Sequence, residues 1–67
     1  MNKKRLSSEQ SLVINALKKD HLTSYQLLKK IKSISLILVL YNILDDLRSM
    51  GILKSYMKQD SKFHYIS

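Results

Sequence analysis

The only glycine of the chain, Gly51, separates two different hydrophobic patterns. Before it, apolar side chains recur at three- and four-residue spacing, which is typical of amphipathic helices. After it, apolar and polar residues alternate from Leu53 onward, which is typical of strands. A chain of 67 residues with this division predicts one small domain, residues 1–67, in which helices precede a β-hairpin.

The first helix is predicted over residues 8–19. Ser7 and Gln10 fit a capping box, in which each side chain bonds to a backbone amide at the start of the helix. Its inward stripe is expected to consist of Leu12, Val13, Ala16 and Leu17. Asp20 and His21 then end the pattern.

The second helix is predicted over residues 24–32, with Thr23 and Gln26 as another capping box. Its inward residues are expected to be Leu27, Leu28 and Ile31. The three lysines near its end suit the negative pole of the helix dipole.

The third helix is predicted over residues 36–50, with Ser35 as its cap. Its apolar residues are Leu36, Leu40, Ile43, Leu44, Leu47 and Met50. Gly51 follows at the position where a left-handed C-terminal cap is needed.

The remaining residues predict a hairpin in which residues 59–62 form a four-residue polar loop. Leu22, between the first two helices, is expected to add a very short third strand. The fold class is therefore mainly α with some β: a winged helix-turn-helix of three helices followed by a β-hairpin wing.

The net charge of +7, from 12 Lys and Arg against 5 Asp and Glu, is large for so small a surface. Such a field attracts polyanions, and nucleic acid is the commonest of them. The chain has no cysteine, so its stability must come from an apolar core, and 45% of its residues are hydrophobic.

Residues 39–52 resemble the third helix of PadR-like regulators and of the ferric uptake regulators. Both families place a tyrosine ten residues before a helix-ending glycine and leucines three and six residues after that tyrosine. The matching residues here are Tyr41, Leu44, Leu47 and Gly51, followed by the aliphatic Ile52. Residues 6–10 look like the opening of a ferric-uptake-type domain, and residues 62–67 look like a PadR-type wing.

The resemblance implies a transcription regulator, with a repressor expected, that binds double-stranded DNA with its third helix in the major groove. The 67 residues contain no counterpart of the metal-binding second domain of the ferric uptake regulators, so metal sensing is not implied. They also lack a counterpart of the C-terminal dimerisation helix of PadR-like proteins. A homodimer is nevertheless expected, through the first helix and the third-helix face, because two copies double the surface available for recognition.

The recognition residues implied are the outward ones in the first half of the third helix. Asn42 can pair with adenine in two places, and the Tyr41 hydroxyl can reach a phosphate, although a half-buried core position is the alternative for Tyr41. Leu38 and Asp45 share this face, and Ser33 and Ser35 lie at the helix tip, where they can hold a phosphate.

Phosphate contacts are expected mainly from lysines. These are Lys54, Lys58 and Lys62 on the wing, joined by His64, and Lys29, Lys30 and Lys32 before the recognition helix. Lys3, Lys4 and Arg5 form a basic N-terminal arm, residues 1–6, that could reach a minor groove. The alternative for any one lysine is a solvated position without a contact.

Two features of the third helix favour a different function. Residues 37–39 are apolar where recognition helices usually carry polar side chains, and Asp45 and Asp46 would repel phosphates. An interaction module that docks a protein partner on this helix is therefore the alternative. A weaker one is single-stranded nucleic-acid binding by stacking on Tyr41, Tyr56, Phe63 and Tyr65, two of which are expected in the core.

Neither an enzyme nor a cofactor is expected. His21 and His64 lie apart without a paired nucleophile, and the adjacent Asp45 and Asp46 diverge on a helix, so no metal site is predicted. The longest apolar run, residues 36–41, is too short to span a bilayer, and no secretory signal is visible. We expect a cytoplasmic, nucleoid-associated protein, with a virus or plasmid as a plausible source.

Overall fold

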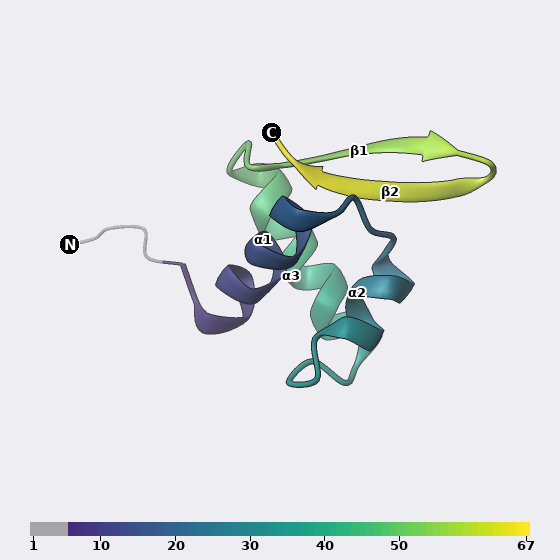
Figure 1. Ribbon diagram of the computed structural model, residues 1–67. Helices are drawn as coiled ribbons and strands as arrows, with labels where there is room; N and C mark the ends of the chain where they lie inside the picture. The colour runs from purple at the N-terminus through teal and green to yellow at the C-terminus, as the bar shows by residue number, and fades with distance from the viewer. Residues whose placement is uncertain (1–5) are drawn as a thin grey trace.

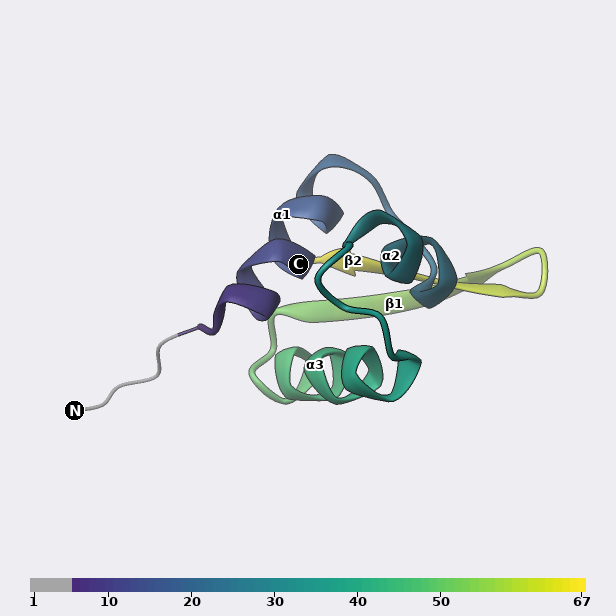
Figure 2. The same cartoon turned by 90° about the horizontal axis from the view of Figure 1, so that it is seen from below.

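The computed structural model describes residues 6–67. Its elements are α1 (Ser8–Lys19), α2 (Ser24–Lys30), α3 (Ile37–Ser49), β1 (Leu53–Lys58) and β2 (Ser61–Ile66). The two strands pair antiparallel, and the hairpin lies along one side of the helices with its tip reaching past them (Figure 1). Figure 2 shows α1 and α3 on opposite sides of the molecule. Three helices followed by a hairpin is the winged helix-turn-helix arrangement predicted from the sequence.

Both predicted capping boxes are present. The Ser7 hydroxyl accepts a hydrogen bond from the Gln10 amide at 3.1 Å, and the Gln10 side chain accepts one from the Ser7 amide at 3.0 Å. Thr23 and Gln26 make the same reciprocal pair at the start of α2. These bonds satisfy amides that have no partner within the helix, so α1 and α2 begin where the sequence predicts.

The C-terminal end of α3 is a complete Schellman motif. Gly51 has a φ of 79°, and its amide donates to the Arg48 carbonyl at 3.0 Å. The Ile52 amide reaches back to the Leu47 carbonyl at 3.0 Å. Apart from Gly51 itself and its two neighbours in the chain, no heavy atom lies within 4 Å of the place where a Cβ would sit on Gly51. Glycine is therefore needed here for its left-handed backbone and not for space.

Two predicted helix boundaries are wrong. α2 ends at Lys30 because Ile31 leaves the helical region and is buried, and the Ile34 amide then donates to the Ile31 carbonyl in a tight turn. Ser35 does not cap α3, which is preceded by Leu36 without a side-chain cap. Burial of Ile31 and Ile34 anchors this turn and leaves Ser35 exposed before the helix starts.

The hairpin loop is shorter than predicted. Only Gln59 and Asp60 connect the strands, both with positive φ (51° and 65°), and the strands pair in register from Leu53 with Ile66 to Lys58 with Ser61. Two left-handed residues produce the twist that suits a two-residue hairpin. The sequence hides this turn because neither position carries the usual asparagine or glycine.

The core joins all three helices and the first strand. Its buried apolar residues are Val13, Ile14, Ala16, Leu17, Leu27, Ile31, Ile34, Leu40, Ile43, Leu44, Leu47 and Leu53. Three predicted core positions are instead largely exposed: Leu12 (44%), Leu36 (65%) and Met50 (41%). Ile14 takes the place of Leu12, because the stripe that α1 buries is rotated relative to the predicted one. The predicted third strand is confirmed as a single bridge between Leu22 and His64.

Candidate functional site

The outer face of α3 is exposed where the sequence predicts. Leu38 is 70% exposed and Tyr41 46%, and Asn42 and Asp45 beside them are also exposed. Tyr41 is therefore a surface residue, not a core residue. Together with Leu36 and Val39, Leu38 makes the N-terminal end of α3 an apolar surface.

A cleft of about 470 Å³ lies between α3, the hairpin and the start of α2. It is lined by Ser24, Tyr41, Leu44, Asp45, Arg48, Lys62 and His64. Two cations, Arg48 and Lys62, thus face a cleft that holds one carboxylate, from Asp45. The cleft borders the exposed face of α3 on one side and β2 on the other.

Arg48 is the functional candidate that sequence reasoning missed. Its guanidinium donates to the Ser55 hydroxyl on β1 at 3.2 Å and lies 3.5 Å from the Asp45 carboxylate. The spacing of Asp45 and Arg48, three residues apart on one helix, was the only signal for this pair. An exposed ion pair of this kind adds little stability. The bond to Ser55 is what holds Arg48 against the hairpin.

His64 is buried, which corrects its expected role as a DNA contact. It is only 3% exposed, and both of its ring nitrogens lie 2.9 Å from serine hydroxyls, Nε2 from Ser24 and Nδ1 from Ser55. Its backbone bonds in both directions to Leu22. The alternation of β2 turns His64 toward the helices, so it links α2, β1 and β2 instead of reaching solvent.

The surroundings of His64 disfavour its protonation. Burial lowers the pKa of His64 below its ordinary value, and the positive charges of Arg48 on α3 and Lys62 on β2 lower that pKa further. Below pH 6.5, the ordinary value, the unfolded chain gains a proton at His64 while the folded chain keeps the ring neutral. The stability that the neutral ring contributes is complete above that pH and is lost as the pH falls through the lowered pKa.

We therefore expect the melting temperature to fall on acidification below pH 6.5, in part through His64. His64→Gln should weaken this pH dependence, because the amide side chain does not titrate. Thermal unfolding followed by circular dichroism across the acidic range measures the effect. His21→Gln is the matched control, since His21 is the other histidine and is exposed. An unchanged pH dependence in His64→Gln would contradict the assignment.

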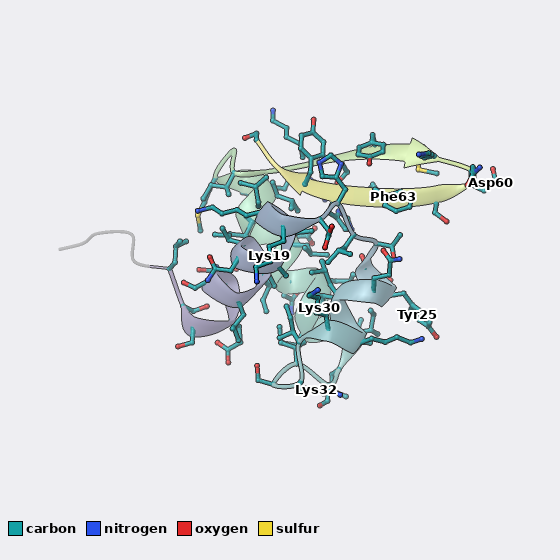
Figure 3. All side chains as sticks on the ribbon, in the orientation of Figure 1. Lys19, Tyr25, Lys30, Lys32, Asp60 and Phe63 are labelled. Carbon is teal, nitrogen blue, oxygen red and sulfur yellow. The ribbon has the colours of Figure 1, made fainter. Side chains whose placement is uncertain are left out.

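The predicted lysines are exposed but do not form one patch. Lys29 and Lys30 end α2, Lys32 follows with Ser33 and Ser35 in the turn before α3, and Lys30 and Lys32 appear in Figure 3. By strand alternation, Lys54 and Lys58 lie on the outer face of the hairpin, whereas Lys62 lies on the face that carries His64. Within residues 6–67, no lysine has a carboxylate within 4.0 Å. The predicted contacts Lys3, Lys4 and Arg5 lie outside the described residues.

Among residues 6–67, no three His, Cys, Asp or Glu side chains gather as metal ligands would. In the same part of the chain, no helix has both the length and the apolar character needed to cross a membrane.

No protein-family model matches the chain, and no curated protein matches it.

Proposed function

We propose that this protein is a double-stranded DNA-binding transcription regulator, a repressor acting at the nucleoid as a homodimer. The observation that carries the proposal is the cleft, because the exposed face of α3 and the hairpin border it from two sides. A duplex lying across the cleft would meet α3 with its major groove and the hairpin with its phosphates.

Positive charge in and around this cleft supports the proposal. Arg48 and Lys62 line it, and no carboxylate of residues 6–67 lies within 4.0 Å of Lys62. Cations without a protein partner can exchange their counterions for phosphates, which provides most of the sequence-independent affinity of DNA-binding proteins.

The exposed side chains of α3 support a role in recognising DNA bases, although the N-terminal end of the helix is apolar. Asn42 is exposed and can bond to both edge groups of an adenine, while Leu38 can contact a thymine methyl group. The carboxylate of Asp45 lies 3.5 Å from Arg48, which offsets the repulsion that it would exert on phosphates. One of the two acidic residues expected to oppose DNA binding, Asp45, is thus partly neutralised within the site, whereas Asp46 has no such partner among residues 6–67.

Fluorescence anisotropy with a labelled random-sequence duplex, titrated at several salt concentrations, tests the proposal. We expect binding whose affinity falls with roughly the fifth power of salt concentration if about six phosphates are contacted. Sedimentation of the complex would give the number of protein copies on the duplex. Absence of binding at low salt would overturn the proposal.

A protein-interaction module is the second candidate, favoured by the apolar end of α3. Leu36 and Leu38 are 65% and 70% exposed, and exposed apolar surface at one end of a helix is typical of a protein-binding site. The duplex titration separates the two functions. If α3 docks only a protein, the wild-type protein should bind the duplex weakly, and Leu38→Glu should bind it with the same low affinity.

A further inference from the structure

The hairpin face opposite His64 carries a cluster of rings, named here the aromatic face: His21, Tyr56, Phe63 and Tyr65. Tyr56 and Phe63 are cross-strand partners whose nearly parallel rings lie 5.7 Å apart between centroids. Tyr65 lies at the same centroid distance from Tyr56, and His21 lies 5.1 Å from Tyr65. The sequence predicts two of Tyr41, Tyr56, Phe63 and Tyr65 in the core, and this prediction is wrong, because none of these four side chains is buried.

The rings are held in place by their neighbours. The Tyr56 hydroxyl and the His21 Nδ1 are 2.8 Å apart, which joins the end of α1 to β1. The backbone of Leu22 pairs with His64 at the edge of β2 that faces away from β1, and this bridge brings the adjacent His21 beside Tyr65 on the outer face of the hairpin. The aromatic face is thus ordered before any ligand arrives, which lowers the entropic cost of binding.

The charge of this face is positive. Lys54 and Lys58 lie two residues on either side of Tyr56, so strand alternation places all three on the same face. Across the hairpin, Lys54 pairs with Tyr65 and Lys58 with Ser61. No strand residue on this face is acidic.

We propose that the aromatic face binds single-stranded nucleic acid, with bases stacked on Tyr56 and Phe63 and phosphates held by Lys54 and Lys58. Aromatic rings interleaved with lysines suit this ligand, since unpaired bases expose flat surfaces and the backbone carries regular negative charge. A duplex keeps its bases stacked and cannot use the rings in this way. The site is separate from the cleft, because it lies on the opposite face of the hairpin from His64.

A second copy of the chain is a poorer occupant for the same face. Two such faces would bring four lysines together without a carboxylate on the strands to compensate them, and like charges repel. Nucleic acid supplies the opposite charge and the flat apolar surfaces together.

Anisotropy with a labelled 15-nucleotide oligo(dT), with oligo(U) in parallel, tests the proposal. The wild-type protein should bind, and Tyr56→Leu and Phe63→Leu should each weaken binding by about tenfold, because each removes a stacking ring. Leucine keeps an apolar side chain in the strand, which favours retention of the hairpin. Tyr56→Phe keeps the ring and loses only the bond to His21, so its affinity should stay close to that of the wild type.

Tyr25→Leu is the matched control. Tyr25 is 71% exposed on α2, away from the hairpin that carries Phe63 (Figure 3), and its loss should leave oligo(dT) binding unchanged. Thermal unfolding of every variant checks that the fold persists. Relative affinities of oligo(dT) and oligo(U) would show whether DNA or RNA is preferred.

The proposal would be overturned if the wild-type protein bound neither oligonucleotide, or if the wild type and a folded Tyr56→Leu/Phe63→Leu variant bound them equally well. It would also be overturned if the wild-type protein bound no oligonucleotide but formed a dimer, and the double variant were a monomer. Duplex affinity is measured in parallel, and the leucine variants should retain it. Failure of duplex binding would therefore leave this proposal standing. Failure of oligonucleotide binding would likewise leave the proposed duplex-binding function standing.

Discussion

Leu40→Ala is expected to destabilise the fold by about 2–5 kcal/mol, the usual cost of truncating a fully buried leucine. The Leu40 side chain is 0% exposed in the middle of the core that α3 shares with α1 and α2. A domain of this size has roughly 3–10 kcal/mol of stability in total, so the variant should lose a large part of it. The melting temperature should fall by roughly 10 °C or more.

Leu38→Ala is the control for this substitution. It removes the same atoms from the same helix, but Leu38 is 70% exposed, so its effect should stay within about 0.5 kcal/mol. Thermal and urea unfolding followed by circular dichroism would measure both variants. Equal melting temperatures for the two would contradict the placement of the core.

Arg48→Glu/Lys62→Glu, which reverses the two cations that line the cleft, is expected to abolish most duplex binding, if the proposed DNA-binding function holds. Losing two phosphate contacts alone weakens binding by roughly 50-fold near 0.1 M salt, and reversing the charges adds repulsion. The slope of log affinity against log salt should also fall by about two. Anisotropy titrations on the random-sequence duplex at several salt concentrations would measure both quantities.

Lys18→Glu/Lys19→Glu is the matched control, because it changes the net charge by the same amount. Both lysines lie in the last turn of α1, which Figure 2 shows on the opposite side of the molecule from α3, and Lys19 is labelled in Figure 3. A duplex bound at the cleft should lose far less affinity in this variant. Equal losses in the two variants would mean that net charge alone, and not the cleft, determines the affinity.

The features predicted correctly from the sequence depend on short-range interactions. The capping boxes of Ser7 and Thr23 each involve residues three apart, and the left-handed Gly51 closes bonds within a few residues. The outward position of Leu38 and Asn42 follows from helical periodicity once Leu40 and Leu44 face the core. These interactions can be recognised in the sequence without knowing the tertiary structure.

The incorrect predictions concern positions whose surroundings come from distant parts of the chain. Whether Leu36 is buried depends on the direction in which the chain enters α3, and the turn before α3, anchored by the buried Ile31 and Ile34, determines that direction. The hairpin loop was predicted too long because its register is determined by pairing across the strands, and Gln59 and Asp60 carry no strong turn signal.

By itself the sequence determined three helices, their N-terminal caps for α1 and α2, the glycine stop of α3 and a following hairpin, because hydrophobic periodicity and capping act over a few residues. Only the tertiary structure decided the surroundings of His64, the position of Arg48 against Ser55, and the gathering of Tyr56, Phe63 and Tyr65 on one face. The physical reason is that Ser24 and His64 are 40 residues apart and His21 and Tyr56 are 35 apart. Such contacts form only when the helices and the hairpin pack together, and no local pattern encodes them.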